Sequence, residues 1–384
     1  MKKFYLLTPG PTPVPEGARE IMSNPIIHHR TREFQEILSE VIEGLKYIFQ
    51  TKNDVLLFSS SGTGAMEAVV ANLLSSGDKA LVVRGGKFGE RWGELTQAYG
   101  IETIFIDVNW GDAAEPGEIQ KILKANLDIK AVFITHCETS TGVVNDVEAI
   151  AKVVSSTKAL LAVDAISSLA SIPLKTDKWM VDVVVAGSQK GLMVPPGLSF
   201  VSVSSKAWDM AEKSTLPKYY FSFKQARKAQ EKANTPWTPA ITLVLALRET
   251  LKMLKNEGLE QVFLRHRRLA EATRQAALAM GLELLAPKSP AISVTAIKLP
   301  EGIDGAALVK NLRKKHGIWV AGGQAQLKGK IIRIAHMGYI KQFELLEAIS
   351  AIEKELSELG YQLESGIGRK AAEEILSQSI VDSR

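Results

Sequence analysis

With 384 residues, the chain is longer than most single domains, so two domains are expected. Hydrophobic residues make up 46% and charged residues 23% of it, which is typical of a water-soluble globular protein. The net charge of +5 is dispersed along the chain, and the single cysteine excludes an internal disulfide. The single cysteine fits a reducing cytoplasm, and the dispersed charge disfavours a nucleic-acid partner. No apolar run reaches the length of a membrane span, so we expect a cytoplasmic protein without a membrane partner.

The first 25 residues are rich in proline and are predicted to form an irregular arm. Prolines at positions 9, 11, 13 and 15 disfavour both a helix and a central strand. We therefore expect residues 1–25 to lie over another surface, either of the same chain or of a partner subunit. His28 and His29 follow the arm, but neighbouring side chains of an extended segment point apart, and no third ligand accompanies them. We expect no metal site there.

Residues 26–257 alternate between helical and strand patterns. The first helix starts near Phe34, and its apolar residues recur every three or four positions up to Phe49, which is typical of a helix with one buried face. Short apolar runs separated by helical segments then favour an α/β fold with a mostly parallel sheet covered by helices on both faces. These runs are Val55–Phe58, Ala80–Val83, Thr103–Ile106, Ala131–Thr135, Leu160–Val163, Val183–Ala186 and Leu198–Val203.

The pattern changes near residue 258. A long helical stretch over 239–282 is expected to break at Gly258, and two strands then alternate with two helices. We interpret residues 26–257 as a large domain and residues 258–384 as a smaller α+β domain, and we assign no role to residues 361–384. The predicted elements of the smaller domain are strands 292–297 and 330–334 and helices 305–315 and 341–359.

Two strands of the predicted sheet end at residues that can act on one ligand. Leu160–Val163 is followed by Asp164, and Val183–Ala186 is followed by Gly187 and the run Ser188-Gln189-Lys190. Ligands of open α/β sheets bind beyond the carboxyl ends of the strands. A lysine amine and a carboxylate are the pair that pyridoxal phosphate needs, one for a Schiff base and one for its pyridine nitrogen. Taken singly, each is more commonly a solvated charge at a strand end.

The run Ser61-Gly62-Thr63-Gly64 lies between a predicted strand and a predicted helix. Small residues and free amides at a helix N-terminus favour phosphate binding, although many such turns bind nothing. The spacing lacks the third glycine of a dinucleotide-binding Rossmann motif, and Lys190 has no P-loop before it. A phosphate group is therefore the expected ligand of this turn.

Three further residues have both a structural and a functional interpretation. Phe88, which lies between glycines at a strand end, can stack on a flat heterocycle or pack in the core. Cys137 has no activating neighbours, which favours a packed and unreactive thiol. Arg333, in the otherwise apolar strand Ile331–Ile334, either pairs with a structural acid or binds a substrate carboxylate.

As a set, these motifs resemble the class V aminotransferases of pyridoxal phosphate fold type I, and among them the alanine–glyoxylate and serine–glyoxylate (serine–pyruvate) aminotransferase group. The resemblance extends from Leu7-Thr8-Pro9-Gly10-Pro11 to Arg333 in the order of the family. It includes Glu138-Thr139-Ser140-Thr141-Gly142, and Ser188-Gln189-Lys190 followed by Pro195-Pro196-Gly197 is its most specific part. The fold that it implies is a large pyridoxal-phosphate-binding domain, here residues 26–257, with a smaller C-terminal α+β domain.

The resemblance also implies roles for individual residues. Lys190 would form the Schiff base with the cofactor, Asp164 would pair with the pyridine nitrogen, and Arg333 would bind the substrate α-carboxylate. Thr238 resembles a position that reaches the phosphate of the neighbouring subunit, which implies a homodimer with a shared active site. The other implied contacts are the phosphate site (Ser61, Gly62, Thr63 and Gln189), ring stacking by Phe88, packing of Ile166 under the ring, Thr139 at the ring hydroxyl, and Gly10 beside the substrate.

The activity that the resemblance implies is a ping-pong transamination of alanine or serine, with glyoxylate or pyruvate as acceptor, through the Lys190 aldimine. The freed Lys190 amine would take the Cα proton. Alternatives within the family are a 2-aminoethylphosphonate–pyruvate transaminase, which would need further cations, and a cysteine desulfurase, which the position of Cys137 disfavours. Alternatives outside it are a catalytically idle binding subunit, which the presence of both Lys190 and Asp164 disfavours, and a nicotinamide-dependent oxidoreductase.

Overall fold

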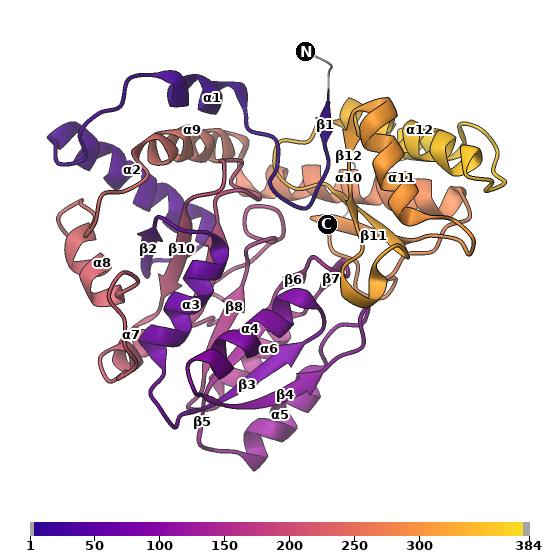
Figure 1. The fold of residues 1–384 in the computed structure, drawn as a ribbon. Coiled ribbons are helices and arrows are strands. Elements are labelled where there is room, and N and C mark those ends of the chain that lie inside the picture. Colours follow the sequence, from indigo (N-terminus) through magenta and orange to yellow (C-terminus); the bar gives the residue numbers. More distant parts are fainter. Residues whose placement is uncertain (1–3, 379–384) are drawn as a thin grey trace.

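The fold is built around a seven-stranded sheet, seen in a computed structural model that describes residues 4–378 (Figure 1). One strand, β10, runs antiparallel to both of its neighbours, and the other neighbouring pairs in this sheet are parallel. The predicted mostly parallel sheet is therefore confirmed. In spatial order the strands are β2 (Asp54–Phe58), β10 (Ser199–Val203), β9 (Val183–Gly187), β8 (Leu160–Asp164), β5 (Ile129–Thr135), β3 (Lys79–Arg84) and β4 (Glu102–Asp107).

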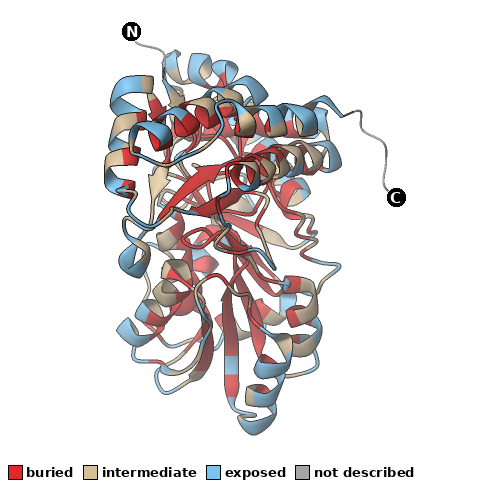
Figure 2. Ribbon diagram, turned by 90° about the vertical axis from the view of Figure 1, so that its right-hand side faces the viewer, coloured by how far each residue is buried: buried red, intermediate tan, exposed pale blue. Residues whose placement is uncertain are grey.

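Helices cover both faces of this sheet because its central strands are apolar on both sides. In β8, Leu161 and Val163 join one core cluster, whereas Leu160 and Ala162 join the other. Figure 2 shows the result, with buried strands inside and exposed helix surfaces outside. The first cluster is completed by α2 (Arg32–Phe49), α5 (Pro116–Ala125), α6 (Val147–Ser155) and α9 (Ile241–Glu257), and the second by α3 (Gly62–Leu73), α4 (Lys87–Ala98), α7 (Ser205–Ala211) and α8 (Phe223–Gln230).

A second core forms around a three-stranded antiparallel sheet near the C-terminus, in orange and yellow in Figure 1. Its strands are β11 (Val294–Lys298), β14 (Ile331–Ala335) and β13 (Ala321–Gly322). The segment 361–384, to which we assigned no role from the sequence, includes a helix that, as far as it is described, packs on α10 (Leu259–Ala279) and α12 (Gln342–Glu358). The helical elements are α10 (Leu259–Ala279), α11 (Gly305–Asn311) with a π-helical continuation (Leu312–His316), a 3-10 turn (Ala325–Leu327), α12 (Gln342–Glu358) and α13 (Ile367–Ser377).

The N-terminal arm is more regular than predicted. Strand β1 (Tyr5–Leu6) pairs in parallel with β12 (Ile318–Trp319), and α1 (Glu16–Ser23) packs on α9. The expectation of an irregular segment over residues 1–25 was therefore wrong for these elements. The prolines explain where the helix starts, because α1 begins directly after Pro15.

The predicted helix break at Gly258 is confirmed. Gly258 has a φ of +82° and separates α9 from α10. The first turns of α10, with Leu259 and Phe263, pack in the large core, and its later residues, from Leu269 onward, pack in the C-terminal core. We propose that the chain divides here into a large domain (26–257) and a small domain (258–384), with residues 1–25 as an arm.

Between residues 4 and 378, no helix has the length and apolar character that crossing a lipid bilayer requires.

Candidate active site

The carboxyl ends of five parallel strands meet at one edge of the large sheet. β2, β3, β5, β8 and β9 run in the same direction. The segments that follow these strands therefore reach the same edge. They carry the predicted site residues Ser61, Gly62 and Thr63 after β2, Phe88 after β3, Thr139 after β5, Asp164 at the end of β8, Ile166 after it, and Gln189 and Lys190 after β9.

Lys190 and Asp164 are both buried at this edge, with exposed fractions of 9% and 3%. Asp164 Oδ1 accepts a hydrogen bond of 2.8 Å from the Ile166 amide. Burial raises the pKa of Asp164 to about 7 and lowers the pKa of Lys190 to about 8. The opposite charge of each residue works against the pKa shift of the other. The site therefore contains a carboxyl group and an amine that both titrate near neutral pH.

The N-terminal arm contacts Lys190 from a distant part of the sequence. Lys190 Nζ donates to the Pro9 carbonyl, and Thr12 Oγ1 donates to the Lys190 carbonyl at 2.9 Å. Gly10 has a φ of +101°, and a Cβ at this position would overlap the Lys190 side chain. The structure thus places Gly10 beside Lys190. It adds Pro9 and Thr12, which no local sequence signal indicated because they lie 181 and 178 residues away.

The first turn of α3 presents unpaired polar groups at the same edge. Ser61 is the N-cap residue, and its side chain makes no capping hydrogen bond. Gln189 Oε1 is buried without a hydrogen-bond partner. A Cβ at Gly187 would lie 3.0 Å from this atom and 3.6 Å from the Gly62 amide nitrogen, so both border the same space. Gly62 has no room for a side chain, because a Cβ there would overlap Ile166. A helix N-terminus of this kind suits an anion.

Arg91 is a further cation at this edge that the sequence interpretation missed. Its Nη1 donates to Thr63 Oγ1 at 3.3 Å, and its guanidinium carbon lies 5.2 Å from the centre of the Phe88 ring. The charge of Arg91 also acts on Asp164 and Lys190. Arg91 follows Phe88 by three positions in α4, so helical periodicity is the signal that would have identified it.

Arg333 connects the small sheet to the segment that follows β5 of the large sheet. It lies in the middle of β14 and is 6% exposed. Its Nε donates to the Gly322 carbonyl at 3.0 Å, and its Nη1 donates to the Thr139 carbonyl at 2.9 Å. Thr139 donates in turn to Ser167 Oγ at 2.6 Å. Both hydrogen-bond partners of Arg333 are neutral carbonyl groups. Burial lowers the pKa of Arg333, and the charge of Glu138 opposes this shift.

Other candidate residues stay outside this group. Thr238 is exposed in the segment before α9, and within residues 4–378 no hydrogen bond joins its side chain to the other site residues. Cys137 is buried with its Sγ 3.1 Å from Ser293 Oγ, and burial raises the pKa of its thiol to about 12, as suits a packed thiol. Across the described part of the chain, no three His, Cys, Asp or Glu side chains form a group that could bind a metal ion.

Comparison with known proteins identifies the family. A model of the family described as aminotransferase class V matches residues 16–340. A protein named soluble hydrogenase, small subunit, from Synechococcus is 45% identical over 379 residues, which cover 98% of this chain and 99% of that one. A serine–glyoxylate aminotransferase from Methylorubrum extorquens is 38% identical over 388 residues, with 98% and 96% covered. The crystal structure of ureidoglycine–glyoxylate aminotransferase from Bacillus subtilis is 30% identical with a TM-score of 0.95, and the match covers 98% of this chain and 99% of that one. The chain belongs to the class V aminotransferase family.

Proposed function

We propose that this aminotransferase transfers the amino group of a small amino acid, serine or alanine, to glyoxylate or pyruvate, with pyridoxal phosphate as cofactor. The observation that carries the proposal is the pair of buried residues Lys190 and Asp164 at the ends of adjacent parallel strands. Family membership supports the reaction type. Glyoxylate appears in the names of both aminotransferases compared above, and serine appears in one of them.

The residues at the sheet edge fit pyridoxal phosphate in charge and in shape. The N-terminus of α3 and the unpaired Gln189 amide suit a phosphate. Gly10 and Gly62 let the side chains of Lys190 and Ile166 lie where a Cβ would otherwise stand. Lys190 would bind the aldehyde carbon, and Asp164 would accept a hydrogen bond from the protonated pyridine nitrogen. The remaining proposed contacts are Ser61, Gly62 and Thr63 at the phosphate, Phe88 and Ile166 on the two faces of the ring, and Thr139 at the ring hydroxyl.

The residues themselves supply proton transfer and orientation. Pyridoxal phosphate, when bound, supplies an electron sink for the negative charge that develops at the substrate Cα. Burial lowers the pKa of Lys190 to about 8, so its Nζ can take the proton from the substrate Cα and would deliver it to the aldehyde carbon of the cofactor. Arg333 would bind the substrate α-carboxylate. Its Nε and Nη1 are already fixed by two carbonyl groups, which would orient the Cα–H bond relative to Lys190.

A homodimer with a shared active site is part of the proposal. Thr238 is exposed, and the ring of the preceding Trp237 stacks on Tyr219 with 4.9 Å between ring centres. Tyr219 and Tyr220 are 71% and 43% exposed. Adjacent exposed aromatic rings are typical of protein interfaces. We propose that a second copy covers this surface and that Thr238 reaches the phosphate of the neighbouring subunit.

The residues of the chain disfavour the alternative activities. A desulfurase needs a reactive thiol, whereas Cys137 is buried and burial raises its pKa to about 12. One relative carries the name of a hydrogenase subunit. An activity that uses an iron–sulfur cluster requires several cysteine thiolates. This chain has a single cysteine, which disfavours such an activity. An idle binding subunit has no need for the buried pair Lys190 and Asp164, whose burial is costly.

A donor and acceptor screen tests the proposal. Purified protein with pyridoxal phosphate is incubated with serine, alanine or 2-aminoethylphosphonate as donor and glyoxylate or pyruvate as acceptor, and the products are measured by mass spectrometry. We expect serine or alanine to convert glyoxylate to glycine, and we expect Lys190→Ala to abolish this conversion. After borohydride reduction, peptide mapping should find the cofactor on Lys190. The proposal would be contradicted if the protein did not bind pyridoxal phosphate, or if the Lys190→Ala variant formed product at the normal rate.

A further inference from the structure

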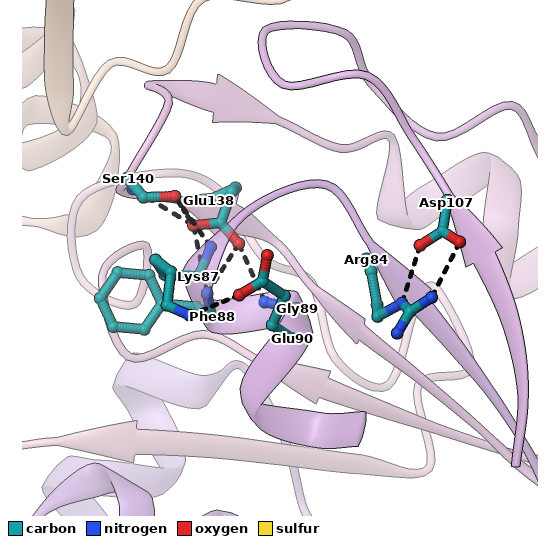
Figure 3. A network of polar contacts seen from close by, with 8 residues as sticks. All are labelled: Arg84, Lys87, Phe88, Gly89, Glu90, Asp107, Glu138 and Ser140. Atoms are coloured by element: carbon teal, nitrogen blue, oxygen red, sulfur yellow. Dashed lines mark hydrogen bonds and ion pairs between the residues drawn. The ribbon is translucent and has the colours of Figure 1, made fainter. Parts of the chain in front are cut away.

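The carboxylate of Glu138 is buried beside the first turn of α4 (Figure 3). Glu138 lies in the short strand β6 (Cys137–Glu138), which pairs with β7 (Val143–Val144), and it is 2% exposed. Its Oε2 accepts hydrogen bonds from the amides of Phe88 and Gly89 at 3.1 and 2.9 Å. Its Oε1 accepts from the amide of Ser140 at 3.2 Å and from the Ser140 hydroxyl.

These contacts replace a cap that α4 cannot make by itself. The N-cap residue of α4 is Gly86, which has no side chain to bind the first amides of the helix. The Ser140 hydroxyl accepts from the Lys87 amide at 3.1 Å, so the pair Glu138 and Ser140 binds three successive amides of this turn. A Cβ at Gly86 would lie 2.6 Å from Glu138 Cδ. The glycine is therefore needed to let the carboxylate approach.

The geometry also indicates the charge state of Glu138. Three of its four donors are backbone amides, which can only donate, and they approach both carboxylate oxygens. Burial raises the pKa of Glu138, and the hydrogen bonds from Ser140, Gly89 and Phe88 oppose this shift. A negative charge at the N-terminus of a helix is favourable, and hydrogen bonds to an ionised acceptor are the strong ones. The four donors around Glu138 thus favour its ionised form.

The ring of Phe88 depends on this backbone contact for its position. Phe88 is half-buried and belongs to none of the four hydrophobic core clusters of the described residues. The Arg91 guanidinium carbon lies over the ring, 5.2 Å from its centre. Its side chain is therefore not fixed by core packing, whereas its amide is fixed by Glu138.

We propose that Glu138 is a positioning residue for the cofactor, which sets the place of the Phe88 ring by capping α4. This inference rests on the proposed function, in which Phe88 stacks on pyridoxal phosphate. Glu138 itself contacts backbone and Ser140, and it positions the cofactor ring through Phe88. Its charge also acts on Asp164, an effect that Glu138→Gln removes while an acceptor oxygen for the amides is kept. The same contact also holds the first turn of α4 close to Thr139, because Thr139 follows Glu138 directly in the chain.

A double-mutant cycle on the affinity of cofactor-free protein for pyridoxal phosphate tests this assignment. The variants are Glu138→Ala, Glu138→Gln, Phe88→Ala and the double variant Glu138→Ala/Phe88→Ala, and Kd is measured by absorbance titration. We expect Glu138→Ala and Phe88→Ala each to weaken binding about tenfold, and the double variant to be no weaker than the worse single one. Glu138→Gln keeps an acceptor oxygen for the amides, so it should recover most of the affinity.

Glu90→Gln is the matched control, because Glu90 lies in the same turn but pairs with the Lys87 side chain. It should leave Kd unchanged. If Phe88→Ala leaves Kd unchanged, the stacking role of Phe88 in the proposed function is wrong. If Phe88→Ala weakens binding while Glu138→Ala does not, or if the two effects multiply in the double variant, the positioning role of Glu138 is overturned. Thermal unfolding of each cofactor-free variant shows whether it still folds. If Glu138→Ala does not fold, the Kd of Glu138→Gln is the test, and a Kd near the wild-type value supports the positioning role.

Discussion

Asp164 ends β8 and Lys190 follows the end of the neighbouring parallel strand β9, and each opposes the pKa shift that burial imposes on the other. The opposition is incomplete, because burial still raises the pKa of Asp164 to about 7 and lowers the pKa of Lys190 to about 8. Both groups therefore reduce the stability of the cofactor-free fold at a pH where they are charged. Such a loss of folding stability is common at active sites, where residues are arranged for binding and reaction rather than for the stability of the fold.

Asp164→Asn should stabilise the cofactor-free protein in a pH-dependent manner. The folded-state pKa of Asp164 is raised from 3.8 to about 7, so the folded protein gains stability from the bound proton at low pH and loses it as the pH rises through this window. At pH 8 the free energy of unfolding of the variant should exceed that of the wild type by on the order of 4 kcal/mol. At pH 5 this difference should be smaller by roughly 3 kcal/mol. Urea unfolding at both pH values measures the difference. The exposed acid Asp107 provides the control, and Asp107→Asn should not stabilise at either pH.

Gly62→Ala should weaken cofactor binding without removing any polar group. A Cβ at Gly62 would overlap the end of the Ile166 side chain, so either Ile166 or the first turn of α3 must move. Because both border the proposed cofactor site, we expect Kd for pyridoxal phosphate to rise about tenfold. Gly117→Ala in α5 makes the same change where a Cβ meets nothing within 4 Å, and it should have no effect. Equal Kd values for the two variants would contradict the assignment of Gly62.

Arg333→Lys should raise the KM of the amino acid and of the oxo acid with little change in cofactor affinity. A lysine ammonium lacks the planar fork of arginine, so it cannot reproduce both carbonyl contacts and also bind a carboxylate with two hydrogen bonds. Steady-state kinetics should show a KM increase of about 100-fold for each substrate. Arg369→Lys, on the surface of α13, is the control. An unchanged KM would assign Arg333 a structural role between β14 and β13.

The residues at strand ends were predictable because their signal is local. A β-branched run followed by a glycine or a charge defines the end of a parallel strand, and parallel strands bring their carboxyl ends to one edge. Asp164, Lys190 and the turn after β2 could therefore be placed together before their contacts were known. The structure confirms that they share this edge. Their chemical roles remain proposals.

Other parts of the site depend on contacts between distant segments. Thr12 reaches Lys190 across 178 residues, and no periodicity indicates such a contact. The same holds for Arg333 and Thr139, which are 194 residues apart. The helix α1 was missed for a different reason, since prolines that prevent a helix before residue 16 permit one that starts after them. Glu138 was noted within a motif, but its capping role requires knowing that α4 begins with a glycine beside it.

The proposed shared active site leads to a prediction for mixed dimers. Lys190 and Arg333 would act on the site of their own chain, because Arg333 bonds to Thr139 of that chain. Thr238, which is exposed, would instead serve the neighbouring subunit. In a dimer of a Lys190→Ala chain and a Thr238→Asp chain, one site would carry both substitutions and the other would carry neither.

Each variant alone should be inactive, and mixing the two should therefore restore activity. If subunits exchange at random in a 1:1 mixture, half of the dimers are hybrid and each has one intact site, so about a quarter of the wild-type activity should return. A mixture of Lys190→Ala and Arg333→Ala is the control, because both residues belong to the same site and every hybrid site lacks one of them. Co-purification of differently tagged chains checks that exchange has occurred. If hybrids form and the first mixture stays as inactive as the control, Thr238 does not serve the neighbouring site.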